Sequence, residues 1–268
     1  MLIIKINLVI TRTPAYSKGV ELATTPLDAV KSFIDFVLPF FPGNIIIVEE
    51  AAWGDTKEGF RMYGYTDLVD TNPRIQLLDL KDDVKITRKI DYPEGELELP
   101  FSRTLLEAPL LVSIVRPKTH CTVGMTAGIK NVAIGAIQGH SNRLKSHRGT
   151  FIHNIIARIS DFIYPDLVIV DGTNGMEGGG PIRGKEIRAN WTLSSFDALA
   201  ADSLVTYLMG FDVNHVGYLG YLKDREAGLL YPDERIEVIG EKPELLVTPF
   251  KPHRKHKCIV RAGSGNHV

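Results

Sequence analysis

The chain has 268 residues, of which 44% are hydrophobic and 24% charged, as is typical of a folded protein with a sizeable core. A net charge of −1 excludes the strong basic field of a general nucleic-acid or membrane-surface binder. The apolar runs stop well short of the ~20 residues that a membrane-spanning helix needs. Cys121 and Cys258 are too few for a disulfide framework or a four-cysteine cluster. We therefore expect a cytoplasmic protein without a signal peptide.

Strand and helix patterns alternate along the chain. The first part predicts a strand at 2–9, a helix at 24–40 with Thr25 as N-cap, a strand at 44–50, a short helix at 57–69 and a strand at 75–80. Residues 81–100 are charged and predict a hairpin or flap. The second part predicts a strand at 110–115, a helix at 150–163, a strand at 166–170, a helix at 196–210 and a strand at 235–240.

This alternation predicts an α/β layered fold, with a mainly parallel or mixed sheet and helices on both faces. The continuous apolar runs at 110–115 and 166–170 are typical of strands that are covered on both faces. We expect a single α/β domain over residues 1–250, followed by a basic C-terminal tail at 251–268.

Polar residues follow the carboxyl ends of two predicted strands. Strand 110–115 leads into Lys118, Thr119 and His120, and strand 166–170 leads into Asp171 and a glycine-rich turn that contains Glu177. Ligands of open parallel sheets bind beyond the carboxyl ends of the strands. If the two strands are parallel, these lysine, histidine and acidic side chains should converge at one edge of the sheet. Arg12 and Glu49, at other strand ends, are candidates for the rim only.

Residues 108–160 contain no Asp or Glu, although about six would be expected from the chain average. The same segment is rich in basic residues: Arg116, Lys118, Lys130, Arg143, Lys145, Arg148 and Arg158, with His120, His140, His147 and His153. Such a segment favours an anionic ligand, for example a phosphate, a carboxylate or a nucleic-acid backbone. The competing interpretation is that acids from elsewhere in the fold neutralise it.

Glycines recur in the same segment, at Gly124, Gly128, Gly135 and Gly139. One interpretation is that they let backbone amides approach a ligand, with a helix N-terminus adding its dipole. The other is close packing of a helix against the sheet. Both interpretations remain open from the sequence.

Several side chains of the segment are candidates for chemistry. His120 and Lys130 could transfer protons, and Asp171 and Glu177 could orient them or hold a divalent metal together with His120. Lys118, Thr119, Lys145 and His147 are candidate ligand-binding residues. Cys121 is more often a packing residue than a nucleophile, and His140 and His153 are more often structural or exposed. Asp202 borders an apolar stripe, so we expect it to pair with a Lys or Arg of the acid-free segment.

Four motifs carry a resemblance to a known family: RPKTHCTVGMTAGIKN at 116–131, LKSHRGTF at 144–151, DLVIVDGTNGMEGGGP at 166–181 and LSSFDALAADSLVTYLMGFD at 193–212. Together with segments 22–37 and 44–56, they resemble the domain of unknown function 362 family, whose members are often labelled uncharacterised iron–sulfur centre proteins. The resemblance covers most of residues 1–240.

The resemblance implies a set of site residues. The family's Lys-Thr-His falls on Lys118, Thr119 and His120, its Lys-Asn on Lys130 and Asn131, and its downstream His on His147. Its glycine-rich motif and its paired acids fall on Asp171, Gly172, Glu177, Gly178, Gly180, Pro181, Asp197 and Asp202. Asn131, Gly178, Gly180 and Asp202 therefore join the candidate ligand-binding residues.

Two departures from the family pattern matter. Some members carry an appended ferredoxin-like segment with clustered cysteines, and this chain has none, so we expect no iron–sulfur cluster from its own cysteines. Many members have Lys-Pro-Asn at the end of the first strand, where this chain has Lys5, Ile6 and Asn7. The resemblance implies no established reaction.

Three functional hypotheses follow. The leading one is an enzyme that acts on an anionic small molecule or cofactor, with a divalent metal as a candidate cofactor. The second is a non-catalytic module for a phosphorylated ligand or nucleic acid, although Trp53 and Trp191 are too sparse to favour nucleic acid. The third is a transition-metal protein that uses His120 with Asp171, Glu177 or His147. A homodimer is a candidate assembly, and we expect no membrane partner.

Overall fold

The computed structural model describes residues 1–11 and 21–256. Its main feature is a six-stranded sheet in the order β12-β9-β6-β1-β2-β3. The strands are β1 (Leu2–Lys5), β2 (Ile45–Glu49), β3 (Ile75–Asp79), β6 (Leu111–Val115), β9 (Leu167–Gly172) and β12 (Trp191–Ser195). Neighbouring strands are parallel, except that β12 is antiparallel to β9. This confirms the predicted mixed, mainly parallel sheet and the parallel pairing of 110–115 with 166–170.

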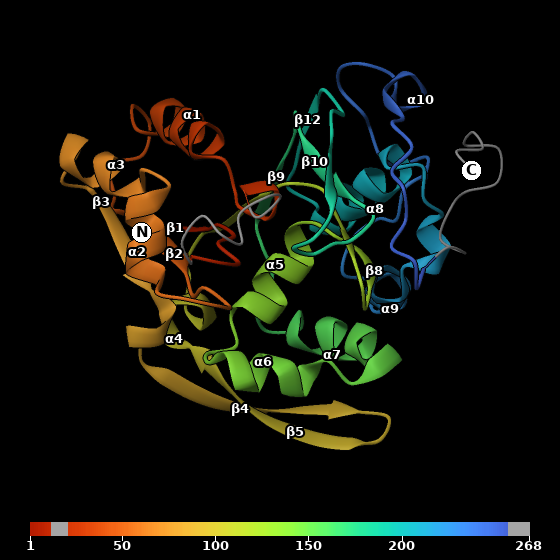
Figure 1. The fold of residues 1–268 in the computed structure, drawn as a ribbon, viewed down its shortest axis with the longest axis horizontal. Helices are drawn as coiled ribbons and strands as arrows, with labels where there is room; N and C mark the ends of the chain where they lie inside the picture. Colours follow the sequence, from red (N-terminus) through yellow and green to blue (C-terminus); the bar gives the residue numbers. More distant parts are fainter. Residues whose placement is uncertain (12–20, 257–268) are drawn as a thin grey trace.

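Helices cover both faces of the sheet. Because successive side chains of a strand point to opposite faces, Ile3 of β1 packs into one apolar cluster while Leu2 and Ile4 pack into another. The Ile3 cluster contains residues of α5 (Gly128–Gly135), α7 (Ile152–Ile159), α8 (Ala198–Leu208) and α9 (Gly217–Asp224). The other contains residues of α1 (Leu27–Val37), α2 (Thr56–Met62) and α3 (Tyr65–Thr71). In Figure 1, α1, α2 and α3 lie at the left of the molecule and α8 and α9 at the right.

The direction in which strands are added reverses at β1. From β1 the chain adds β2 and β3 on one side of the sheet, and later adds β6 and β9 on the other. At such a reversal the connections after the two strands run to opposite faces, which leaves a crevice at their carboxyl ends where ligands of α/β proteins bind. The crevice is therefore expected beyond Lys5 of β1 and Val115 of β6.

A second, four-stranded sheet extends from this edge. It has the order β11-β10-β7-β8 and consists of β7 (Lys118–His120), β8 (Gly124–Thr126), β10 (Gly175–Glu177) and β11 (Lys185–Ile187). Only two residues separate β6 from β7 and β9 from β10. The sequence does not reveal this sheet because three residues are too few to show a strand's alternation.

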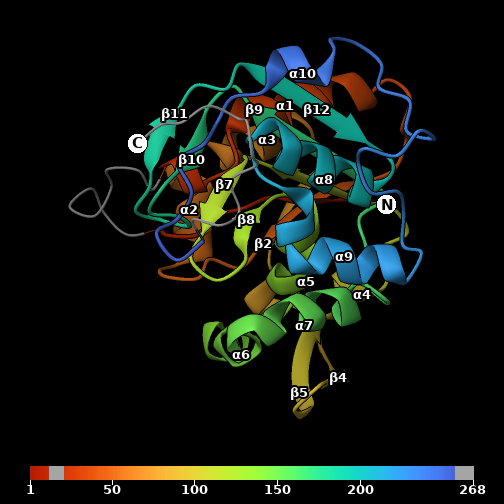
Figure 2. The ribbon, with the colours of Figure 1, turned by 90° about the vertical axis from the view of Figure 1, so that its right-hand side faces the viewer.

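The segment predicted as a hairpin or flap is a hairpin of β4 (Lys85–Tyr92) and β5 (Gly95–Ser102). It is packed and not free, since Ile90, Leu97, Leu99 and Phe101 are buried in the same cluster as Ile3. Figures 1 and 2 show the hairpin beneath α6 (His140–Ser146) and α7. Helix α4 (Arg103–Leu106) follows it directly.

Three local predictions are wrong. The helix at 57–69 is divided into α2 and α3 by Gly64, which has a φ of 75°. Residues 235–240 form no strand and lie before the short α10 (Pro243–Leu246). Thr25 does not cap α1, where Pro26 occupies the N-cap position. The Thr25 hydroxyl instead accepts a hydrogen bond from Asn7 N–H (2.9 Å) and donates one to Ile114 O (2.7 Å). These two bonds connect the segment after β1 to β6.

The start of the predicted basic tail packs against the second sheet. Lys251 N–H donates to the Glu177 carboxylate (2.8 Å), and its carbonyl accepts from Gly178 N–H (2.7 Å). Residues 257–268 of the tail and Arg12 lie outside the described residues. None of the helices in the described ranges has both the length and the apolar character needed to cross a bilayer.

Candidate functional site: a cationic cavity at the β1–β6 crevice

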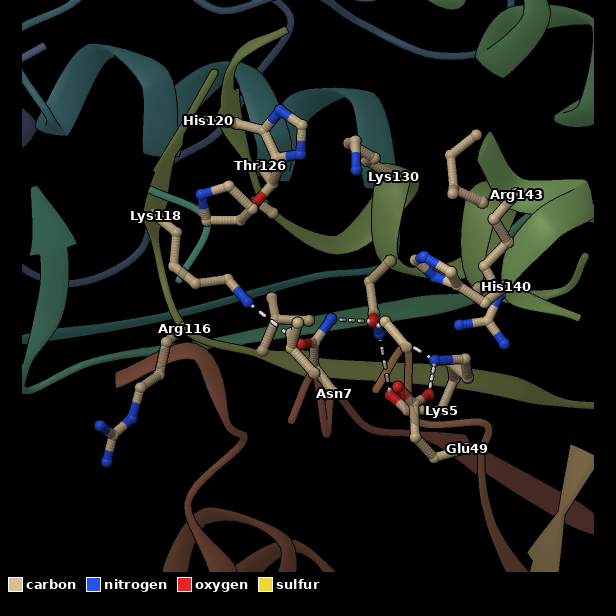
Figure 3. A pocket seen from close by; sticks show the side chains of 18 of the residues that line it. Lys5, Asn7, Glu49, Arg116, Lys118, His120, Thr126, Lys130, His140 and Arg143 are labelled. Carbon is tan, nitrogen blue, oxygen red and sulfur yellow. Dashed lines mark hydrogen bonds and ion pairs between the residues drawn. The ribbon is translucent and has the colours of Figure 1, made fainter. Parts of the chain in front are cut away.

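A cavity of about 160 Å³ lies at the carboxyl ends of β1, β2 and β6, where the strand order predicts a crevice. Figure 3 shows its basic side chains around a common space. The lining residues with polar or charged groups are Lys5, Asn7, Glu49, Trp53, Arg116, Lys118, His120, Thr126, Lys130, Asn131, His140, Arg143 and His147. Among the described residues that line the cavity, Glu49 is the one acid.

The alternation of β7 decides which of its side chains reach the cavity. Lys118 and His120 are two residues apart and both line it, whereas Thr119 between them points to the other face. The Thr119 hydroxyl is fully buried there, 3.4 Å from the carbonyl oxygens of Met176 and Gly178. Of the predicted Lys-Thr-His triplet, the structure therefore brings two residues to the cavity.

Lys118 is almost completely buried, with 4% of its surface exposed. Its ammonium donates hydrogen bonds to Ala23 O (2.8 Å) and Asn7 Oδ1 (3.1 Å), which are neutral acceptors. Burial, reinforced by the charge of Lys130, lowers the pKa of Lys118 to about 7. No acid is paired with this amine among the described residues.

Lys130 projects into the same cavity from α5 (Figure 3). Its amine makes no hydrogen bond or ion pair with any described residue. Burial is the main cause that lowers the pKa of Lys130 to about 8. Lys118 and Lys130 thus face one space as two cations that the described part of the protein does not neutralise.

The floor of the cavity is a fully bonded network around Lys5. The Lys5 ammonium forms a buried ion pair with Glu49 and donates to Ile6 O (2.8 Å). Asn131 donates to Lys5 O (3.2 Å) and to Ser113 Oγ (3.1 Å), and its Oδ1 accepts from Asn7 (2.9 Å). These contacts link β1, β2, β6 and α5, so Asn131 lines the cavity with its polar atoms already used.

His120 and His147 each bond to the backbone through Nδ1, but their Nε2 atoms differ in protonation. Nδ1 of His120 accepts a hydrogen bond from Thr122 N–H (3.0 Å), so the ring proton lies on Nε2. Nδ1 of His147 lies 2.8 Å from Arg143 O, which can only accept, so this nitrogen carries the proton and Nε2 is free to accept. The rings are stacked with centroids 6.1 Å apart. Burial holds the pKa of His120 well below its ordinary value and lowers that of His147 to about 4.

The predicted acids do not join the lysines. Lys118 pairs with Met176 in the β7–β10 ladder, so the next residue, Glu177, falls beside Thr119 on the face that points away from the cavity. On β9, Val170 is paired with Val115, which lines the cavity. The side chain of the following residue, Asp171, therefore points to the opposite face, and its carboxylate accepts from Thr173 N–H (2.9 Å). Strands β6 and β9 are parallel as predicted. Asp171 and Glu177, however, each follow directly after a position that faces the cavity, so their side chains point away from it.

Asp202 has partners other than the predicted Lys or Arg. Its fully buried carboxylate accepts hydrogen bonds from Gly128 N–H (2.8 Å), Ile129 N–H (3.2 Å) and the Tyr218 hydroxyl (2.9 Å). It thus caps the N-terminus of α5 from α8 and does not line the cavity. Burial raises the pKa of Asp202 to about 7. The N-terminus of α5 therefore already has a carboxylate as its partner, which argues against the interpretation that a helix N-terminus in the glycine-rich segment binds the ligand.

The glycines serve packing in two clear cases. A Cβ on Gly128 would lie 2.5 Å from the Val168 side chain, so this glycine lets α5 pack on β9. A Cβ on Gly135 would lie 2.7 Å from Cε and Nζ of Lys5, so this glycine leaves room for the buried amine. These contacts favour the packing interpretation at both positions.

Three further candidates lie away from the cavity. Lys145 is exposed on α6 and donates to Asn142 Oδ1 (3.0 Å). A Cβ on Gly180 would lie 1.9 Å from Thr119 O, so Gly180 allows close packing of its loop on β7. Gly178, with a φ of 74°, holds the contact to Lys251.

No three His, Cys, Asp or Glu side chains gather closely enough to hold a metal ion within residues 1–11 and 21–256. The predicted ligand set of His120, Asp171 and Glu177 is therefore not assembled in this structure. The reason is the register described above, which places the two acids on faces away from His120.

Several lining residues escaped sequence reasoning. Lys5 and Asn7 belong to the first strand and its end, and Glu49, predicted for the rim, is buried against Lys5. A lysine within the apolar run LIIKINLV is a signal that could have indicated a site. Trp53 and His140 carry no comparable signal, because a single tryptophan or histidine indicates no particular role by itself.

The fold and this cavity define a doubly wound α/β protein with a cationic pocket at its topological switch point. The chain belongs to the family described as domain of unknown function (DUF362), whose model matches residues 2–207.

Individual relatives are distant. A thylakoid-associated protein of Synechocystis sp. is 27% identical over 120 residues, which cover 42% of this chain and 36% of that protein. The lactate racemase apoprotein from Thermoanaerobacterium thermosaccharolyticum has a TM-score of 0.48 at 15% identity, covering 77% of this chain and 48% of that one. A protein of Thermotoga maritima has a TM-score of 0.41 at 13% identity, covering 73% and 51%. The chain thus spans about a third to a half of the length of these proteins.

Proposed function

We propose that this protein is an enzyme that acts on an anionic small molecule bound in the cationic cavity. One observation carries the proposal: Lys118 and Lys130 face the cavity without an acid partner among the described residues. Desolvated charges in proteins are normally paired, and a bound anion would supply the missing charge. A concave site of this size suits a small molecule better than a nucleic acid, which would need a broad basic face.

The histidine pair supports a catalytic role over simple binding. As neutral rings, His147 offers an unprotonated nitrogen that can accept a proton, and His120 offers an N–H that can donate a hydrogen bond to the ligand. Burial is the main cause that lowers both histidine pKa values, and the charge of Lys130 adds to it. An anion bound to the lysines would offset the part of each shift that is due to this charge and so raise both pKa values. We assign Lys118 and Lys130 to charge binding, His147 to proton acceptance, and His120 to a hydrogen bond that orients the ligand.

The proposal is tested with titration calorimetry on small phosphate esters and carboxylates. At least one of them should bind the wild-type protein, and Lys118→Met and Lys130→Met should each weaken this binding by tenfold or more. Methionine approximates the length of the lysine side chain and removes its charge. Lys145→Met is the matched control, since Lys145 is exposed and does not line the cavity.

Equal weakening by the control variant would show a nonspecific surface effect and contradict the proposal. Unchanged affinity in both cavity variants would also contradict it. The catalytic part is tested separately by solvent hydrogen exchange into the bound ligand, followed by NMR. His147→Gln should slow this exchange at least a hundredfold while leaving affinity within threefold of wild type.

A further inference from the structure

Trp53 is the feature of the cavity that charge binding does not explain. Its indole ring lines the cavity while 40% of the residue remains exposed to solvent. Large aromatic side chains gain stability when they are buried, so an exposed tryptophan at a pocket is unusual. The ring lies against the His140 ring with a centroid separation of 4.7 Å and an interplanar angle of 53°.

The backbone holds Trp53 firmly in this exposed position. Trp53 N–H donates to Val9 O (3.1 Å), and Thr11 N–H donates to Trp53 O (3.0 Å). These bonds join the segment after β2 to the segment after β1, directly beside the switch point. The main chain of Trp53 is therefore held between the segments that follow β1 and β2, and its ring lines the cavity from there.

Apolar residues line the cavity on the side of Trp53, together with Arg143, whose charge is paired with Glu50. Val9, Ala52 and Leu144 line the cavity with Trp53, and 55% of Leu144 is exposed. In the view of Figure 3, His140 lies across the pocket from Lys118, with Lys130 between them. The cavity thus has one end with two unpaired lysines and another end with two aromatic rings, where the neighbouring Arg143 is already paired with Glu50.

We propose that the anion bound by this protein carries a planar aromatic ring, which lies against Trp53 and His140 while its carboxylate or phosphate pairs with Lys118 and Lys130. This inference rests on the proposed function and names the class of its ligand. A ring of this kind would cover the exposed indole face and gain the offset-stacked or edge-to-face contacts that aromatic pairs prefer. Neutral His140 favours such contacts, because burial lowers its pKa.

The test compares phenyl phosphate with methyl phosphate, which carry the same charged group and differ in the ring. We expect phenyl phosphate to bind the wild-type protein about tenfold more tightly, which corresponds to about 1.4 kcal/mol. Trp53→Ala should remove this preference and leave the affinity for methyl phosphate within twofold. Phe196→Ala is the control, because Phe196 is an aromatic residue with 83% exposure that does not line the cavity.

Fluorescence gives a second readout. The described tryptophans are Trp53 and the buried Trp191, so Trp191→Phe leaves Trp53 as the only tryptophan of the chain. Phenyl phosphate should change its emission, and methyl phosphate should not. Equal affinity for the two esters, or a preference that persists in Trp53→Ala, would overturn this inference but leave the proposed function standing. Binding of neither ester, together with no binding of benzoate or acetate, would overturn both.

Discussion

At the scale of single residues, Lys118 and Lys130 differ from the other buried cations of the site. Lys5 is paired with Glu49, and Arg143 with Glu50 at 2.9 Å. Lys118 has only neutral acceptors, and Lys130 has neither hydrogen bond nor ion pair among the described residues. The pairs hold the cavity together, and the two unpaired amines are available to a ligand.

The lowered lysine pKa values predict how anion binding depends on pH. Both amines must be protonated to attract an anion, and they lose their protons as the pH rises through about 7 for Lys118 and about 8 for Lys130. The affinity for sulfate, whose charge is constant in this range, should therefore fall at least tenfold between pH 6.5 and 9.5. Titration calorimetry at several pH values measures this change.

The control for this prediction is the Lys118→Arg, Lys130→Arg double variant. Arginine keeps its charge throughout the range because its pKa exceeds 12. In this variant the pH dependence should largely disappear. A wild-type affinity that is constant from pH 6.5 to 9.5 would show that the lysines do not bind the anion in their charged form.

At the scale of secondary-structure elements, α5 is the support of the site. It carries Lys130 and Asn131, and Asp202 of α8 fixes its N-terminus through two backbone hydrogen bonds. Tyr218 of α9 adds a third bond to the same carboxylate. One acid thus connects three helices and sets the position from which Lys130 enters the cavity.

Removal of this acid should destabilise the fold. Asp202→Ala leaves two backbone amides without an acceptor and the Tyr218 hydroxyl with only Met125 Sδ at 3.3 Å, so we expect a loss of about 2–4 kcal/mol in the free energy of unfolding. Urea denaturation measures it. Asp161→Ala is the control, since its partly exposed pair with Arg225 should contribute less than about 1 kcal/mol. A loss in Asp202→Ala no larger than in this control would contradict the capping role.

The longer helices and strands could be predicted from the sequence. The short strands, and the contacts between residues far apart in the chain, could not. Continuous apolar runs identified β6 and β9 because parallel strands covered on both faces need them. The Asp202 cap could not be predicted, since it joins residues 74 positions apart. Thr25 matched an N-cap pattern, yet its hydroxyl bonds to strand ends, because the tertiary contact competes with the local one.

At the scale of the whole molecule, the order of the strands places the site. Alternation of strands and helices predicted the class of fold, but the central position of β1 depends on contacts between residues 3 and 111 and between residues 2 and 45. That position makes the β1–β6 edge the switch point and puts Lys5 and Asn7 at the cavity. From the sequence, the end of the first predicted strand offered only Arg12 as a candidate for the rim.

Face and register decided the rest of the site. Lys118 and His120 were predicted at a strand end and do line the cavity. Asp171 and Glu177 were placed at the same edge, but a strand's alternation of faces cannot be fixed until its pairing is known. Each acid lies one residue beyond the position that would point its side chain toward Lys118. The site is therefore cationic, and does not combine lysines with Asp171 and Glu177 as predicted.

The most direct test of this account is NMR of the lysine side-chain amines, with Lys118 and Lys130 assigned from their Lys→Arg variants. Without ligand, the two amines should titrate near pH 7 and 8. A bound phosphate ester should raise both pKa values by at least one pH unit and leave the exposed Lys145 unchanged. Titration of both amines at the ordinary lysine value of about 10.4, with no response to any anion, would contradict it.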